Sequence, residues 1–153
     1  MNDIKRILVV SRMTEYCRKA VKMGTSLAKK YSAELYVVHV IHNPFGLAGW
    51  NLPGIFNVEA EYKELLQETR KDLDEIIAFE KEQGMSVHVL IAEGEPTEEI
   101  MKAVKDHSID LLIMLAHEEG RLEHFLFGRS NEALIREMPC SILMVKNEPQ
   151  PTT

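Results

Sequence analysis

Short apolar runs alternate with longer amphipathic stretches along the whole chain. Five of these runs are almost continuously apolar, which is typical of strands buried on both faces of a parallel sheet. They are Ile7–Val10, Leu35–Ile41, Val87–Ile91, Leu111–Ala116 and Ile142–Val145.

Between the runs, apolar residues recur at helical spacing, which predicts a helix in each interval. Thr14 suits the N-cap of a first helix that reaches Tyr31, and a second helix covers roughly residues 58–83 with Gly84 at its C′ position. Pro96 favours the first turn of a third helix. Ser130 suits the N-cap of a short fourth helix, which ends before residue 139.

The order of elements is therefore strand–helix repeated four times and closed by a fifth strand. Strands joined through helices form a parallel sheet with right-handed crossovers and helices on both faces. The 153 residues suit one domain, and no break in composition marks a second. We expect this α/β domain to span residues 1–147, with a flexible tail over residues 148–153.

One segment breaks the alternation. Residues 43–57 contain Gly and Pro, which prevent regular structure, but they are rich in large apolar side chains. These are Phe45, Leu47, Trp50, Leu52, Ile55 and Phe56. Two interpretations of this Phe45–Phe56 loop stay open: a surface that binds a protein partner or closes as a lid, and a cover over the sheet edge or a dimer seam.

Charge and hydropathy exclude several classes of partner. The net charge is −6 and the pI about 5.5, which argues against a general nucleic-acid binder and against docking on anionic lipid. No apolar stretch approaches the roughly 20 residues that span a bilayer, and the first residues lead directly into a strand. We expect a cytoplasmic protein with no membrane or nucleic-acid partner. Its cysteines, Cys17 and Cys140, are expected to be small buried apolar groups.

The common catalytic and metal-binding motifs are absent from the sequence. Gly-x-Ser-x-Gly, Gly-x4-Gly-Lys-(Ser/Thr) and Gly-x-Gly-x-x-Gly do not occur, and we therefore expect no enzyme activity. The His117-Glu118-Glu119 run with His124 lacks the spacing that places two histidines on one helix face, so a solvated loop without metal is expected. His39 and His88 lie in predicted strands and are expected to be hydrogen-bonded core or edge groups.

The loop after the fourth strand is the main candidate for a binding site, because ligands of open parallel sheets bind at the carboxyl ends of the strands. This loop ends at Gly128-Arg129-Ser130, directly before a predicted helix. Two interpretations stay open here as well: a phosphate-binding nest at a helix N-terminus, and a tight turn followed by an N-cap.

The sequence resembles the universal stress protein family over nearly its whole length. The opening KRILVVSRMTEYCRKAVKMGTSLAKKYSAELYVVHVI, the segment GEPTEEIMKAVKDHSIDLLIM and the ending FGRSNEALIREMPCSILMVK carry the resemblance. It implies a doubly wound five-stranded sheet of order 3-2-1-4-5, of the adenine nucleotide alpha hydrolase-like type. It also implies a regulatory stress-response module that forms a homodimer through the last strand. The strand residues are Ile142, Leu143, Met144 and Val145.

The nucleotide site of that family is only partly matched. ATP-binding members carry Gly-x2-Gly-x9-Gly-(Ser/Thr) after the fourth strand, and in this chain the pattern falls on Leu115, Glu118, Gly128 and Arg129. Only Gly128 matches. The acidic residue that usually follows the first strand is replaced by Arg12, whereas the hydroxyl two residues later is retained as Thr14.

The sequence thus favours a regulator that is not an ATP binder of this type, because added bulk and acidic side chains stand where glycines would admit a triphosphate. The alternative is a nucleotide or anion sensor that uses the cleft between the loops after strands 1 and 4. The cofactor is left undefined, with ATP still among the candidates. The candidate binding residues are Arg12, Thr14, Val40, His117, Gly128, Arg129 and Ser130.

Overall fold

The computed structural model describes residues 3–11, 17–41, 81–116 and 129–146, together with isolated helical residues between 64 and 78. The Phe45–Phe56 loop and the tail 148–153 lie outside the described residues. The helical residues between 64 and 82 agree with the predicted second helix, and Gly84 after them has φ +84°, as a C′ glycine requires.

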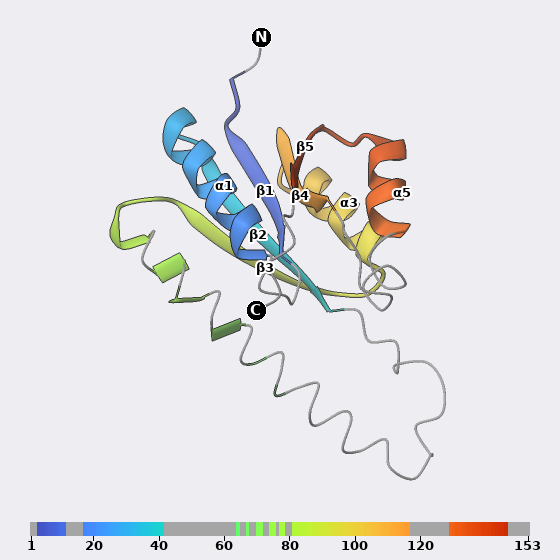
Figure 1. The fold of residues 1–153 in the computed structure, drawn as a ribbon, viewed down its shortest axis with the longest axis horizontal. Helices are drawn as coiled ribbons and strands as arrows, with labels where there is room; N and C mark the ends of the chain where they lie inside the picture. Colours follow the sequence, from blue (N-terminus) through green and yellow to red (C-terminus); the bar gives the residue numbers. More distant parts are fainter. Residues whose placement is uncertain are drawn as a thin grey trace, which may run out of the picture.

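The described chain forms one five-stranded sheet in the order β3-β2-β1-β4-β5, and every neighbouring pair is parallel (Figure 1). This confirms the predicted order 3-2-1-4-5. The strands are β1 Arg6–Ser11, β2 Glu34–Ile41, β3 Val87–Glu93, β4 Leu111–Ala116 and β5 Ser141–Lys146. The labelled helices are α1 Cys17–Tyr31, α3 Pro96–Asp106 and α5 Arg129–Glu137.

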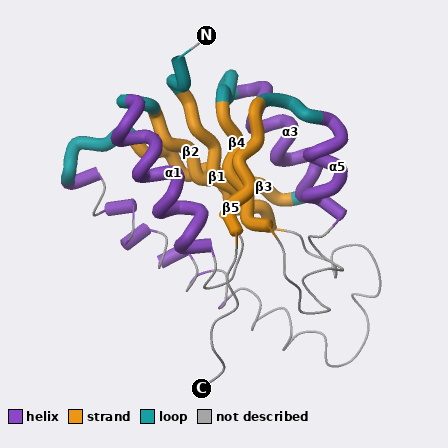
Figure 2. The backbone as a smooth tube through the Cα atoms, turned by 45° about the horizontal axis from the view of Figure 1, so that its top comes forward, coloured by secondary structure: helices purple, strands orange, loops and turns teal. Residues whose placement is uncertain are grey.

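The sheet separates two apolar cores, because successive side chains of a strand point to opposite faces. Ile7 and Val9 of β1 belong to the core beneath α1, and Leu8 and Val10 belong to the core beneath α3 and α5. Figure 2 shows α1 on one side of the sheet and α3 with α5 on the other. The three central strands are buried on both faces, as their continuous apolar runs predicted.

Helix α1 lies unusually close to the sheet at Gly24. A Cβ atom at this position would collide with Cγ2 of Val9 and would stand 3.2 Å from Cδ1 of Leu35. A glycine is therefore required here by packing, and it fixes the height of the helix above β1 and β2. The predicted apolar stripe of α1 is otherwise buried as expected at Ala20, Val21 and Ala28, but Tyr31 at its end is exposed.

The ends of the other helices follow local chemistry. Glu95 is the N-cap of α3 and accepts a 2.9 Å hydrogen bond from the Glu98 amide, and Pro96 occupies the first turn, as predicted. Helix α5 begins at Arg129, so Ser130 lies inside the first turn and its predicted role as N-cap is wrong. The helix starts two residues earlier than a cap at Ser130 would give.

Asp110 joins the two central strands at their amino ends. One of its carboxylate oxygens, Oδ2, accepts hydrogen bonds from the amides of Lys5 and Arg6, each at 2.9 Å. Its own amide donates to the Arg6 carbonyl, also at 2.9 Å. This bracket aligns β1 with β4, so that their opposite, carboxyl ends lie beside each other.

Candidate functional site

The order of the strands places a switch point at the carboxyl ends of β1 and β4. From β1 the chain continues to β2 and β3 on one side, and β4 and β5 lie on the other side of β1. Crevices that bind ligands in open α/β sheets form at such a point, because the two neighbouring connections leave in opposite directions. Strand β1 ends there at Ser11 and β4 ends at Ala116.

Two polar side chains stand in adjacent strands at this end of the sheet. Ser11 of β1 and His39 of β2 are partners in the β1–β2 register. Both are more than nine-tenths buried, with 3% and 7% of their surfaces exposed. By the alternation of side chains they lie on the same face as Val9 and Val37, which is the face covered by α1. We call this pair the polar recess.

The polar recess lies beneath the first turn of α1. The helix starts at the carboxyl end of the sheet, since β2 begins again at the opposite end (Figure 1). Gly24 sits above Val9, and Ser11 is about 6.6 Å further along β1. One helical turn covers about 5.4 Å, which brings Ala20 above Ser11. The backbone amides at the N-terminus of α1 therefore point toward this end of the sheet.

No described residue satisfies the hydrogen-bonding groups of the recess. Ser11 Oγ, His39 Nδ1 and His39 Nε2 are all buried without a hydrogen-bond partner in the described part of the chain. Leaving such groups unpaired costs about 1–3 kcal/mol each, so native proteins rarely keep them without a reason.

The imidazole in the recess is held in its neutral form. Burial lowers the pKa of His39, because removal from water penalises the charged ring. The backbone of Ser11 raises the pKa of His39, but by less than burial lowers it. The distance and angle from this backbone group to the ring do not make a hydrogen bond. A neutral imidazole carries one donor and one acceptor, and a hydroxyl carries both functions as well. The recess can thus bind a group that both donates and accepts hydrogen bonds.

A second polar cluster lies near the opposite, amino end of the sheet, on the face of α3. The Tyr36 hydroxyl donates a 3.0 Å hydrogen bond to Glu34 Oε2, and His88 Nε2 lies 3.4 Å from the same oxygen. Ser86 Oγ is 3.2 Å from His88 Nε2. The rings of His88 and His107 flank Tyr36, with centroid distances of 4.7 Å and 4.9 Å. This amino-end cluster is satisfied internally, and His88 behaves as the sequence predicted.

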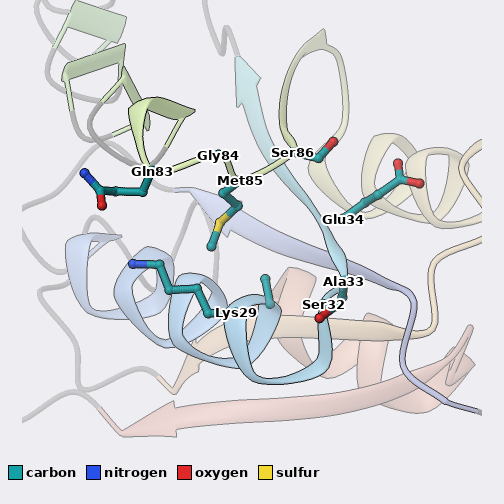
Figure 3. Close-up of a pocket in the computed structure, with 9 residues that line it drawn as sticks. Lys29, Ser32, Ala33, Glu34, Gln83, Gly84, Met85 and Ser86 are labelled. Carbon is teal, nitrogen blue, oxygen red and sulfur yellow. The ribbon is translucent and has the colours of Figure 1, made fainter.

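A pocket of about 360 Å³ also opens at the amino end, between the end of α1 and the chain that enters β3. Figure 3 shows Met85 pointing toward α1, whereas Gln83 and Glu34 point away from Met85. Glu34 is directed instead to Tyr36 on the other face. The pocket is therefore lined by the ends of two helices and by the thioether of Met85, and the carboxylate of Glu34 does not point into it.

Most of the predicted site residues fall where the structure gives no description. Arg12, Thr14, His117 and Gly128 lie outside the described residues, and so does the His117–His124 stretch. Arg129 and Ser130 form the first turn of α5, with only their backbone described. Their proposed roles in binding stay predictions.

Val40 and Leu115 are described, and both side chains serve the apolar cores. Val40 belongs to the core beneath α3 and α5, on the face opposite to the recess. Leu115 belongs to the core beneath α1. Ser11 is not among the residues that the sequence predicts for the site, and His39 was predicted to be hydrogen-bonded, which is wrong. The available signal was a polar residue near the carboxyl end of each of two apolar runs that become neighbours in the sheet.

The described residues contain neither a group of three metal-ligating side chains nor a helix long and apolar enough to span a membrane. Cys140 is a free, half-buried thiol, and burial raises its pKa. A thiol with a raised pKa carries little thiolate at neutral pH. The predicted burial of Cys140 is only partial in the structure.

Known proteins with similar sequences belong to one family, and their similarity covers nearly the whole chain. Residues 3–146 match the Universal stress protein family. Universal stress protein MJ0577 of Methanocaldococcus jannaschii is 30% identical over 156 residues, covering 94% of this chain and 96% of that protein. Universal stress protein MJ0531 of the same organism is 27% identical over 146 residues, and the alignment covers 95% of this chain and 84% of that protein.

Solved structures show the same architecture. Universal stress protein UspA from Lactobacillus plantarum superposes with a TM-score of 0.74 at 17% identity, covering 95% of this chain and 99% of that chain. The match over residues 3–146 contains every described strand, the switch point and the polar recess. This chain is a member of the universal stress protein family.

Proposed function

We propose that this protein is a non-catalytic regulatory module of the stress response that binds a small nucleotide-like ligand at the switch point between β1 and β4. The observation that carries the proposal is the polar recess: buried, unpaired hydrogen-bonding groups at the end of the sheet where such folds bind ligands. Membership of the family supports the regulatory role.

Two structural neighbours support a ligand with few phosphates. One, a family protein from Arabidopsis thaliana, has AMP bound, and another universal stress protein is in complex with cAMP. In this chain, Glu118 and Glu119 follow β4 and would repel a triphosphate, and the glycine pattern of the ATP-binding members is matched only at Gly128. We therefore favour a mononucleotide or nucleoside over ATP.

Isothermal titration of the purified protein with adenosine, AMP, cAMP and ATP tests this proposal. We expect measurable binding of at least one of the first three, and weaker binding of ATP. Gly128→Val and Arg129→Ala, after the fourth strand, are expected to weaken AMP more than adenosine. Binding of none of the four, or ATP as the tightest ligand, would refute the proposal. Phosphate release from ATP above background would refute its non-catalytic part.

We further propose a cytoplasmic homodimer formed through β5. This strand is the sheet edge beside β4, and Met144 on it is 36% exposed. Exposed apolar groups also occur at Ile135 of α5 and at Met138, directly after this helix, which are 45% and 61% exposed. An edge strand with apolar side chains tends to pair with a second strand, and a second copy of β5 supplies one.

Light scattering after size-exclusion chromatography tests the dimer. Met144→Lys is expected to yield a monomer, because it places a charge in the proposed interface. Met23→Lys on α1 is the matched control, since Met23 is similarly exposed but is not part of the edge strand. A monomeric wild-type protein, or a Met144→Lys dimer, would contradict the proposed interface. A protein partner for the Phe45–Phe56 loop stays a prediction.

A further inference from the structure

Strand β3 forms the edge of the sheet opposite to β5, and β2 is its only partner among the described strands. The Ser86 carbonyl accepts the Leu35 amide, so Ser86 and every second residue after it direct their backbone groups toward β2. Val87, Val89 and Ile91 therefore direct their N–H and C=O groups outward, where no described residue bonds them. An edge with unpaired backbone groups is a template for one more strand.

The two faces of this edge strand differ in chemistry. Val87 and Val89 belong to the core beneath α1, so Ile91 projects on that face as well, where it is 45% exposed. Leu90 lies on the opposite face and packs against the core beneath α3 and α5. A strand added beside β3 would therefore meet an exposed apolar side chain on one face and the surroundings of Leu90 on the other.

A groove of about 340 Å³ lies on the Leu90 face, between β3 and α3. Its apolar base includes Leu90 and Ala103. Glu99 and Asp106 line the α3 side of the groove two helical turns apart, about 10 Å along the helix axis, with Lys102 between them. The groove is therefore apolar at its base and predominantly acidic along its α3 side.

We propose that this edge of the sheet binds an extended segment of another protein in which basic and apolar residues alternate. The segment adds to β3 through backbone hydrogen bonds. Its basic side chains cover Leu90 with their aliphatic stems and reach Glu99 and Asp106 with their charged ends. Its apolar side chains pack beside Ile91 on the other face. This inference does not depend on the ligand proposed at the switch point, and it concerns the edge opposite to the proposed dimer interface.

Charge distinguishes a basic partner from a second copy of this chain. The chain has a net charge of −6, and Glu95 and Glu98 add further carboxylates at the start of α3, close to Glu99. A second copy that paired through β3 would bring another set of these carboxylates to the same edge, where like charges oppose association. A basic segment gains attraction from each of them. The acidic groove therefore selects a positively charged partner over self-association.

Nitrogen-15 NMR of the full-length protein with a synthetic peptide tests this proposal. The probe is an acetylated and amidated peptide, Lys-Val-Lys-Val-Lys-Val-Lys, which has the seven-residue length of β3. The outward amides of Val89 and Ile91 are expected to shift and to exchange more slowly with solvent, whereas the inward amides of His88 and Leu90 should change little. No change at Val89 and Ile91 at millimolar peptide concentration would refute the proposal.

Two control peptides separate strand pairing from general electrostatic attraction. One carries Glu in place of each Lys, and the other, Val-Val-Val-Lys-Lys-Lys-Lys, has the composition of the probe without its alternation. Both are expected to bind at least about fivefold more weakly than the probe, and equal binding of either would contradict the proposal. If the protein alone shows the same amide protection with rising concentration, the occupant is a second copy and the basic partner is refuted.

Substitutions on the two sides of the groove give an independent test. Glu99→Gln combined with Asp106→Asn is expected to weaken the probe about fivefold. The matched control is Glu132→Gln combined with Glu137→Gln, which makes the same change of charge at exposed positions of α5 and should alter affinity by less than about twofold. Ile91→Pro removes one outward N–H and no hydrogen bond to β2, so it is expected to abolish binding.

Circular dichroism establishes that each variant is folded before titration. If Ile91→Pro does not fold, the two double variants decide the question alone, because all four of their positions are on the helices that flank the sheet. Equal affinity of the two double variants for the probe would show that the groove carboxylates do not recognise a basic partner, and the proposal would be wrong.

Discussion

His39 and His88 lie on adjacent strands of one sheet but in opposite environments. His88 is at the amino end, half-exposed, with Ser86 Oγ and Glu34 Oε2 both near its Nε2. His39 is near the carboxyl end, beneath α1, and neither of its ring nitrogens has a partner in the described chain. The same residue type thus stabilises the sheet at one end and is left available at the other.

The difference follows from the topology. At the amino end, the strands begin after tight turns, and short polar side chains such as Ser86 and Glu34 are within reach of the neighbouring strand. Near the carboxyl end, Ser11 and His39 lie on the face that α1 covers, and no described polar side chain is within hydrogen-bonding reach of them. A polar group buried there costs stability unless a ligand satisfies it. Unpaired polar atoms therefore distinguish the end of the sheet at which we propose binding from the amino end, where the polar groups have partners.

The largest effect is expected from a change in the distance between α1 and the sheet, because this helix buries the polar groups at the carboxyl end. Gly24→Val is expected to lower the free energy of unfolding by about 3 kcal/mol, because the new side chain collides with Val9 and must lift the helix. Chemical denaturation measures this loss. Ser26→Val, at an exposed position of the same helix, is the control and is expected to change stability by less than about 0.7 kcal/mol.

If Gly24→Val proved as stable as Ser26→Val, α1 would not be packed tightly on the sheet at this position. The explanation that this packing buries the recess would then be wrong. A destabilised but folded Gly24→Val protein should also bind adenosine more weakly, because the roof of the recess is displaced. The amino-end cluster, which lies on the other face of the sheet, should keep its ring contacts.

Removal of the Asp110 bracket is expected to have a somewhat smaller effect. Asp110→Ala eliminates two hydrogen bonds to the amides of Lys5 and Arg6, and a loss of about 2 kcal/mol in unfolding free energy is expected. Asp106→Ala, at the exposed end of α3, is the control and should be nearly neutral. Equal stability of the two variants would show that the bracket does not hold β1 to β4.

Much of this fold could be predicted from hydrophobic periodicity alone. The five strands, the helical intervals and the parallel order follow from apolar runs such as Leu111–Ala116, since short runs without charges that alternate with helical stretches are typical of strands in a parallel sheet. Boundaries were less certain. Ser130 was assigned to the N-cap from its side chain, but the helix already begins at Arg129, because backbone geometry rather than one hydroxyl determines the first turn.

The recess could not be predicted in the same way. Ser11 and His39 are 28 positions apart in sequence, and only the register of β1 and β2 makes them neighbours. Their lack of partners depends on the burial that α1 imposes, which depends in turn on the glycine above Val9. The predicted phosphate-binding residues were found by resemblance to a family pattern, whereas the recess is a property of packing that no local motif records.

Acid should distinguish the two histidines. Because burial lowers the pKa of His39 in the folded state, the unfolded chain binds a proton more readily, with a pKa near about 6.5. The stability that neutral His39 contributes is therefore complete above that value and is lost as the pH falls below it. Denaturation of wild-type protein at several pH values between 5 and 8, compared with His39→Phe, measures this contribution.

The slope of stability against pH should be shallower in His39→Phe than in wild-type protein, because the variant lacks the buried ring that takes up a proton on unfolding. Adenosine should protect wild-type protein more at pH 7.5 than at pH 5.5. An identical pH profile for the two proteins would mean that His39 is already partnered in solution and that the recess is not poised for a ligand.

The smallest expected effect is at the amino-end cluster. Tyr36→Phe removes one hydrogen bond to Glu34 but retains the ring between His88 and His107, so a loss of about 0.5–1 kcal/mol in unfolding free energy is expected. Adenosine affinity should not change, since this cluster lies on the opposite face and at the opposite end. A Tyr36→Phe protein that bound adenosine more weakly than wild-type protein would show that the two ends of the sheet are coupled, and the division into a structural and a binding end would fail.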